Sequence, residues 1–183
     1  EPEVGDVAVF VFPGDNETDS IKRIVGLPGD KVEVRDGILY LNDVAAKREL
    51  LSASETEELG YRRPIGLLYY ETLPNGRRHL IREEADNRRY DNFLPVVVPE
   101  GHFFAMGDNR DNSLDSRDNV GMVPFENLVG RAEFLFFSHD GSSAWSEFWN
   151  WPGARRFRRI FDGVEQRGRT SQDAESCGPG SGA

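Results

Sequence analysis

The sequence predicts a mostly β protein built from antiparallel strand pairs. Short runs rich in β-branched and aromatic residues recur from residue 4 to residue 137, and such residues suit a pleated, half-buried surface. Two junctions between these runs are Asp36-Gly37 and Asn75-Gly76, dipeptides that favour tight β-hairpin turns. A hairpin joins antiparallel neighbours, so the runs and their junctions together predict antiparallel sheets.

The first two strands are predicted over residues 4–12 and 20–25, on either side of an acidic loop. The first run is almost continuously apolar, which is typical of a strand buried on both faces. In the second, alternation places Lys22 and Ile24 on one face and Arg23 and Val25 on the other.

A rigid turn and a hairpin follow. Residues 27–30 fit a type II turn, because Pro28 presets φ at its second position and Gly29 supplies a positive φ at its third. Residues 31–42 form the first hairpin, with Asp36-Gly37 at its tip.

The middle of the chain has a different character and is interpreted as an inserted lobe over residues 45–92. It begins with a polar, irregular stretch in which residues 45–51 have a weak helical pattern, and it contains the second hairpin, over 67–73 and 77–81. Charged, loop-like residues close it. The sequence therefore predicts a discontinuous core, residues 1–44 and 93–161, interrupted by this lobe.

The core pattern resumes with strands predicted over residues 93–98, 102–106 and 131–137, and with a short turn over 123–129. Residues 145–161 are aromatic and basic; covering the β core and contacting a membrane interface are equally good interpretations. Residues 162–183 are rich in Gly, Ser, Gln and charge, so this tail is expected to be disordered.

Composition excludes several classes of protein. The formal net charge of −10 argues against a nucleic-acid partner, which needs a basic face. A lone cysteine, Cys177, provides neither a disulfide framework nor a thiolate metal site. No apolar run approaches the ~20 residues of a membrane helix. Because the sequence begins at Glu1 in a polar segment and lacks a signal peptide, an upstream part is expected to be missing.

Lys22 stands in the middle of an apolar strand just before the rigid turn. Its stem could lie on the sheet while the ammonium reaches water. Alternatively, Lys22 is partly buried, neutral near pH 7 and able to accept a proton. Lys31 and Lys47 have more polar neighbours and are expected to be solvated.

Residues 107–117 form a dense polar loop of Asp, Asn, Arg and Ser. A calcium loop starting at Asp111 would need a glycine where Ser116 stands and a glutamate where Met122 stands, so no metal site is expected. Asp and Arg at such density favour an internally hydrogen-bonded segment that holds the backbone rigid. His79, His102 and His139 lack the spacing of metal ligands.

Four segments in this order together resemble the catalytic domain of type I signal peptidase. They are Gly-Asp-Val-Ala-Val-Phe at 5–10, Ile-Lys-Arg-Ile-Val-Gly-Leu-Pro-Gly-Asp at 21–30, the 107–117 loop, and Val-Pro-Phe-Glu-Asn-Leu-Val-Gly-Arg at 123–131. The likeness covers roughly residues 4–44 and 93–160, whereas 45–92 corresponds loosely to the family's variable lobe.

The resemblance implies antiparallel sheets of the signal-peptidase type and a Ser–Lys endopeptidase without a cofactor. In that reading Lys22 is the general base, and Ser113 hydrogen-bonds its amine and aims the lone pair. Asp115 and Arg117 form a supporting ion pair, and Gly107 and Asp108 shape the adjacent backbone. The implied substrates are preprotein signal peptides with small residues before the cleavage site, cut at the surface of the bacterial cytoplasmic membrane on its outer, periplasmic side.

This sequence lacks the residue that serves as the family's nucleophile. It is a serine directly before a methionine, in a Ser-Met-x-Pro segment that precedes the region matched here. Met106 follows Ala105 and Met122 follows Gly121. The chain is therefore expected to be an N-terminally truncated, inactive piece of the enzyme.

Two other functions are compatible with the pattern. A degenerate β-rich module could bind extended peptides by adding them to a sheet edge, without catalysis. A self-cleaving repressor-type Ser–Lys domain is disfavoured, since no DNA-binding segment is present.

Overall fold

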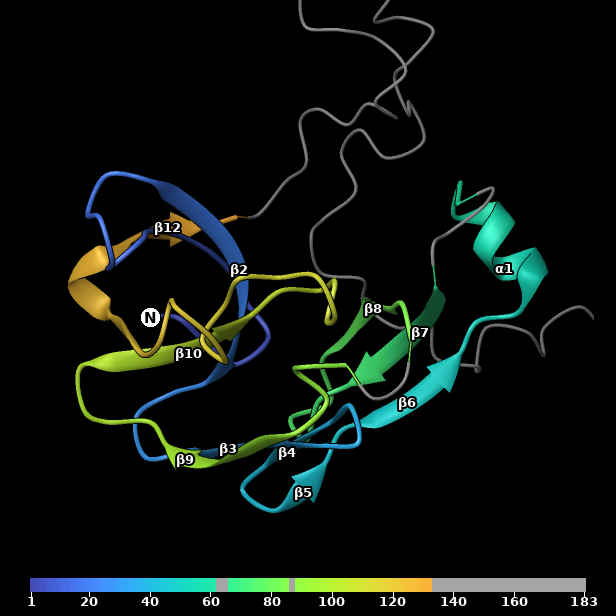
Figure 1. The fold of residues 1–183 in the computed structure, drawn as a ribbon, viewed down its shortest axis with the longest axis horizontal. Helices are drawn as coiled ribbons and strands as arrows, with labels where there is room; N and C mark the ends of the chain where they lie inside the picture. The colour runs from blue at the N-terminus through green and yellow to red at the C-terminus, as the bar shows by residue number, and fades with distance from the viewer. Residues whose placement is uncertain (62–65, 86–87, 133–183) are drawn as a thin grey trace, which may run out of the picture.

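The computed structural model describes residues 1–61, 66–85 and 88–132, and these form a mostly β protein of antiparallel sheets, as predicted (Figure 1). The largest sheet has five strands in the order β11-β10-β2-β1-β12. Their bounds are β1 Val7–Val11, β2 Asp19–Gly26, β10 His102–Met106, β11 Val123–Pro124 and β12 Leu128–Arg131. Strand β2 lies between β1 and β10, so Lys22 is carried by an inner strand.

From β2 the chain enters the second sheet, which has the order β5-β4-β3-β9. Its strands are β3 Lys31–Arg35, β4 Ile38–Leu41, β5 Val44–Ala45 and β9 Phe93–Val97. The turn into β3 has Gly29 at φ +88°, and the hairpin tip has Asp36 and Gly37 at φ +48° and +76°. Both predicted turns are therefore present, with positive φ where glycine tolerates it best.

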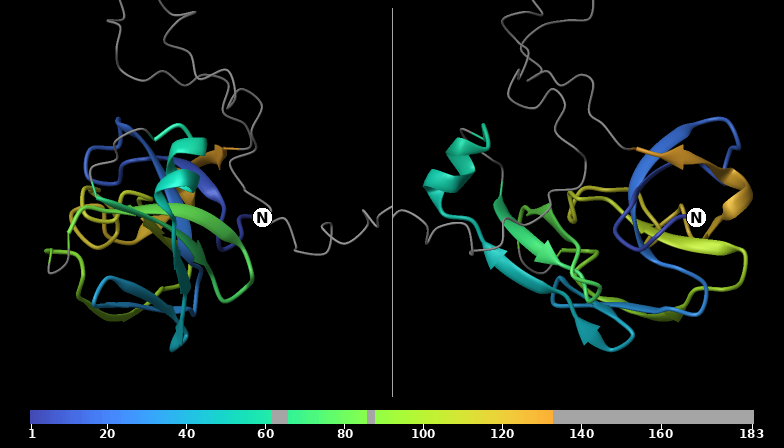
Figure 2. Two further views of the ribbon diagram at one scale, coloured as in Figure 1. Left: turned by 90° about the vertical axis from the view of Figure 1, so that its right-hand side faces the viewer. Right: turned by 180° about the vertical axis from the view of Figure 1, so that it is seen from behind.

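The third sheet, β6-β7-β8, extends away from the other two and leads to α1 at its far end (Figures 1 and 2). Its elements are β6 Lys47–Leu50, β7 Leu67–Thr72, β8 Arg78–Glu83 and α1 Ala53–Glu58. The hairpin predicted around Asn75-Gly76 joins β7 to β8.

The weak helical prediction for residues 45–51 is wrong. That stretch forms β5 and β6, because β6 pairs with β7 from Lys47 opposite Thr72 to Leu50 opposite Tyr69. The helix begins later, after Ser52, whose side chain and that of Glu55 form a reciprocal capping box. Long-range pairing thus overrode a weak local preference, and the cap set the start of α1.

Two hydrophobic clusters cover opposite faces of β2. Ile24 belongs to one cluster with Ala8 and Ala105, and Val25 belongs to the other with Phe104 and Met106. The second cluster also takes in the strands of the second sheet. Alternation along β2 therefore sorts its side chains between two packed layers.

Some boundaries differ from those predicted. Strand β1 is not buried on both faces: Ala8 and Phe10 are buried, whereas the valines between them are half-buried, because only one face meets a core cluster. The last described strand, β12, begins at Leu128 and follows a 3-10 turn at Phe125–Asn127. The remainder of the strand predicted over 131–137 falls largely outside the described residues, as do 145–161 and the tail. Among the described helices, none has the length and apolar character needed to cross a membrane.

Candidate functional site

Lys22 lies on β2, directly opposite Ala8 of β1. It is half-buried, and the strand alternates, so its side chain shares a face with Ile24. In the described part of the chain, Lys22 has neither an ion-pair nor a hydrogen-bond partner for its side chain. The amine is therefore not paired with a carboxylate of the described residues.

Strand register brings Ser113 to the same face. The ladder between β10 and β2 pairs Ala105 with Ile24 and Met106 with Arg23, so the next residues along the two strands are Gly107 and Lys22. A Cβ on Gly107 would meet Ser113 Oγ at 2.1 Å. Gly107 thus leaves the space that Ser113 occupies, on the face where alternation also directs Lys22.

Ser113 is buried, and its hydroxyl has no hydrogen-bond partner among the described residues. A buried hydroxyl without a partner is unusual and calls for an explanation, often a functional one. The hydrogen bond to Lys22 that the resemblance implies is not made in this structure. Ser113 is therefore placed against Gly107 with its hydroxyl unbonded among the described residues.

Asp115 joins the two ends of the 107–117 loop by hydrogen bonds. Its fully buried carboxylate accepts bonds from Arg117 Nε at 3.0 Å and Nη2 at 2.7 Å, and from the Gly107 amide at 2.9 Å. Burial alone would raise the pKa of Asp115, but the hydrogen bonds and charge of Arg117, together with backbone amides, hold it below the usual value. Asp115 therefore stays ionised and fixes the backbone next to Lys22.

Asp108 has a larger part than the sequence suggested. It accepts hydrogen bonds from Arg23 Nε and Nη2 at 3.0 and 2.9 Å, and Arg23 also donates to the Gly5 carbonyl at 2.7 Å. Despite partial burial, the pKa of Asp108 is lowered by the Arg23 guanidinium. This bidentate pair ties the loop to the strand that carries Lys22.

Ser116 and Arg110 are further positioning contacts that the sequence did not single out. Ser116 exchanges two bonds with Ala105: its Oγ accepts from the Ala105 amide, and its amide donates to the Ala105 carbonyl, each at 3.0 Å. Arg110 forms a buried ion pair with Glu71 of β7. The sequence signal for the second pair was Glu71 itself, a charged residue within the predicted hairpin strand 67–73.

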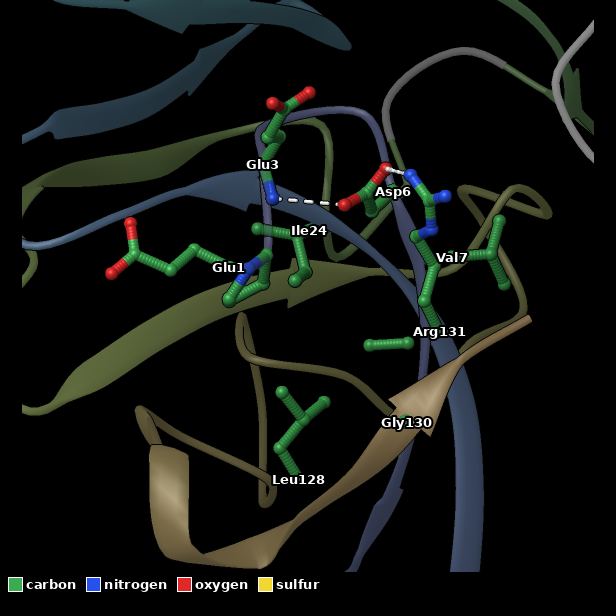
Figure 3. A pocket seen from close by; sticks show the side chains of 10 residues that line it. Glu1, Glu3, Asp6, Val7, Ile24, Leu128, Gly130 and Arg131 are labelled. Carbon is green, nitrogen blue, oxygen red and sulfur yellow. Dashed lines mark hydrogen bonds and ion pairs between the residues drawn. The ribbon is translucent and has the colours of Figure 1, made fainter. Parts of the chain in front are cut away.

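A cavity of about 400 Å³ lies beside β1 and β12, near this site. Figure 3 shows Ile24 and Leu128 bordering it, with Asp6 bonded to Arg131 and to the Glu3 amide. Arg77 also pairs with Asp6, and these hydrogen bonds keep the pKa of Asp6 low despite its burial. Ala8 lines the cavity, whereas Lys22 and Ser113 do not.

The other lysine and histidine candidates have different surroundings. Lys31 pairs with Asp43 at 2.7 Å, His102 Nδ1 lies 2.9 Å from the Glu100 carbonyl, and His139 falls outside the described residues. His79 is buried beside Glu71. Within 1–61, 66–85 and 88–132, no group of three or more His, Cys, Asp or Glu side chains is arranged to hold a metal ion.

Comparisons with known proteins agree with the sequence motifs. A family model described as "Signal peptidase, peptidase S26" matches residues 1–137. Signal peptidase I of Rickettsia typhi is 45% identical over 147 residues, and that of Rickettsia akari is 44% identical over 145 residues. Each alignment covers 75% of this chain and 53% of the relative.

Among solved structures, a signal peptidase I from Enterococcus faecalis V583 is 30% identical, with a TM-score of 0.42. That match covers 72% of this chain and 96% of the other. The chain spans about half the length of the curated relatives it matches.

Proposed function

The chain belongs to the signal peptidase family, peptidase S26, and we propose that it supplies the general base of a Ser–Lys endopeptidase that removes signal peptides from exported preproteins. The observation that supports this proposal is the close approach of Ser113 to Gly107, which strand register places opposite Lys22. The register of β2 and β10 leads to Gly107, and Ser113 Oγ fills the space above that glycine.

Lys22 is the proposed base. A serine hydroxyl is a weak nucleophile until a neighbouring base takes its proton, and a neutral lysine amine can do so. The serine oxygen would attack the scissile carbonyl while its proton passes to Lys22 Nζ. Lys22 would then give this proton to the departing amine of the substrate. The neutral Lys22 amine would next activate a water molecule, which hydrolyses the acyl-enzyme.

Ser113 is the proposed orienting group. Its buried hydroxyl, free of other partners among the described residues, can accept a hydrogen bond from the Lys22 amine. That bond would direct the lone pair of the amine towards the nucleophile. Asp115 and Arg117 would keep Ser113 in place through the rigid loop.

The nucleophile is proposed to come from outside residues 1–183. No serine directly precedes a methionine in this sequence, and the curated relatives are about twice as long as the matched region. We place the assembled enzyme at the outer face of the bacterial cytoplasmic membrane, where exported preproteins emerge. Without that upstream nucleophile, the chain is expected to be inactive.

Substrate choice follows from the same model. A signal peptide bound as an added strand would point alternate side chains into the enzyme. Shallow pockets there would admit alanine at the first and third positions before the scissile bond. The test uses this chain joined to the proposed upstream segment that carries the nucleophile, called the longer protein below. A preprotein with a large aromatic residue at either position should not be cleaved by it. Efficient cleavage of such a substrate would reject this specificity.

A non-catalytic peptide-binding module is the second candidate. Strand β9 lies at the edge of its sheet, and Leu94 and Val97 on it are 83% and 63% exposed. Such an edge can accept a peptide strand.

One experiment separates the two functions. The chain and the longer protein are each incubated with a labelled preprotein, and both binding and cleavage are measured. The protease proposal requires cleavage by the longer protein and none by the chain. If both proteins bind the preprotein and neither cleaves it, the peptide-binding module is favoured. If the chain cleaves without the upstream segment, a nucleophile lies within residues 1–183.

A further inference from the structure

Glu71 is a fully buried carboxylate near the end of strand β7, directly before its last residue. Arg110 bonds it with both terminal nitrogens, Nη1 to Oε1 at 3.1 Å and Nη2 to Oε2. His79 Nε2 lies 3.3 Å from Oε2, and Arg48 Nε lies 3.6 Å from Oε1. Burial would raise the pKa of Glu71, but the charge of Arg110 and the contact with His79 hold it well below the usual value.

Arg110 belongs to the 107–117 loop, so this ion pair joins the third sheet to the candidate site. The backbone repeats the connection: the Arg82 amide donates to the Asp108 carbonyl at 2.8 Å, and the Arg110 amide donates to the Arg82 carbonyl at 2.9 Å. Side chain and main chain of Arg110 are thus both fixed to the β7–β8 hairpin.

A continuous set of hydrogen bonds runs from Arg110 to the residues around Ser113. The Arg110 carbonyl accepts from Arg117 Nη2 at 2.8 Å. Arg117 in turn holds Asp115, which accepts from the Gly107 amide. Moving Arg110 would therefore disturb both Asp115 and the glycine against which Ser113 packs.

The loop forms no helix or strand between β10 and β11, so its shape depends on hydrogen bonds and ion pairs, among them Arg23–Asp108 and Ser116–Ala105. Arg110 adds a buried ion pair from the loop to β7. Orienting a lysine amine requires placement within roughly 0.5 Å. A bidentate arginine–carboxylate pair offers that geometric control.

We propose that Glu71 and Arg110 are positioning residues for the Lys22 site, through which the β6–β8 sheet fixes the loop that carries Ser113. This inference rests on the proposed protease function. It assigns the sheet outside the two core clusters a role in catalysis, although none of its residues would touch substrate.

The first test is kinetic and uses the longer protein. Glu71→Gln keeps the shape of the side chain and removes its charge. It should lower kcat by about 10-fold with little change in KM, since misplacement of a catalytic group by about 1 Å can cost as much as 10²-fold. In a Ser113→Ala background the same change should lower kcat less than about 2-fold, because coupled residues are not additive.

The matched control is Glu49→Gln. Glu49 lies on β6 and pairs with Arg78 of the same sheet, with its side chain 63% exposed and not bonded to the loop. It should leave kcat unchanged. Equal losses for Glu71→Gln in both backgrounds would overturn the inference, because a merely structural role would act independently of Ser113.

The second test uses this chain and needs no cleavage. Glu71→Gln should accelerate hydrogen exchange of the Gly107, Ser116 and Arg117 amides, whose bonds hold the loop, and leave the β1–β2 amides unchanged. Unchanged exchange in the loop would contradict the inference. If the wild-type longer protein fails to cleave, the proposed function fails, while this arm still shows whether Glu71 fixes the loop.

A second variant guards against misfolding. Removing one partner of a buried pair leaves an uncompensated charge, whereas replacing both by apolar residues is often tolerated. Glu71→Leu combined with Arg110→Met should therefore fold, yet show the same loss of kcat and the same faster loop exchange. Wild-type values for a folded double variant would refute the positioning role.

Discussion

Single side chains were predicted from the sequence where strand alternation alone decides their surroundings. Lys22 lies within a strand as predicted, and Gly29 adopts the positive φ that its turn requires. The ion pair between Asp115 and Arg117 is present. That this ion pair supports catalysis stays a prediction, as do the roles of Lys22 and Ser113.

Other residues needed information that lies far away in the sequence. Arg23 was placed correctly on the face opposite Lys22, but its partner Asp108 is 85 residues distant. The same holds for Glu71 and Arg110, 39 residues apart. A local pattern shows that a charge points inward, but not which opposite charge will meet it.

The role of Ser113 can be tested at this scale by Ser113→Ala in the longer protein. Loss of one orienting hydrogen bond to a buried partner should cost about 1–3 kcal/mol, a fall in kcat of roughly 5- to 150-fold. KM should change little, because the hydroxyl is not expected to contact substrate. Steady-state cleavage of a preprotein measures both constants.

Ser54→Ala, an exposed change in α1, serves as the control and should have no effect. Unaltered kinetics for Ser113→Ala would return Ser113 to an ordinary loop serine.

At the scale of elements, the turns and the two hairpins were predictable, and the pairings between strands distant in sequence were not. Both hairpins and the 27–30 turn follow from two or three adjacent residues, which is why they were found. Strands β5 and β6 were missed because their stability comes from pairing with β4 and β7. Helix α1 carried a local signal, the capping box of Ser52 and Glu55, that was not used.

The β7–β8 hairpin should make stability depend on pH through His79. This imidazole is 2% exposed and lies opposite Glu71, with Arg23 of β2 and Asp108 of the loop nearby. Burial lowers its pKa from the usual 6.5, more than the Glu71 carboxylate raises it. The unfolded chain therefore binds a proton first as the pH falls below about 6.5, so the folded state loses stability towards acid pH.

Urea denaturation between pH 7 and 5.5 measures this effect before most carboxylates titrate. The wild type should lose stability across that window, and His79→Gln should flatten the decline. His102→Gln, at a half-buried histidine in β10, should retain it. A decline that is equally steep in His79→Gln would contradict the assignment.

At the scale of the whole molecule, the sequence predicted a core interrupted by a lobe. The described residues form two sheets around common hydrophobic clusters and a third sheet made from β6, β7 and β8 (Figure 2). What could not be foreseen is how firmly the third sheet is joined to the 107–117 loop by buried charges. In the sequence the lobe is polar and charged, and that composition does not show which of its charges are buried or which residues they pair with.

Proton acceptance by Lys22 is the claim on which the functional account depends. The most direct measurement is cleavage of a preprotein by the longer protein carrying Lys22→Ala or Lys22→Arg, with Lys31→Ala as the control for loss of a lysine on the next strand. Circular dichroism confirms that each variant is folded. Both Lys22 variants should lose about 10³-fold or more in kcat, the arginine because its guanidinium stays protonated, while Lys31→Ala should match the wild type. Substantial cleavage by Lys22→Arg would contradict the assignment of Lys22 as the base.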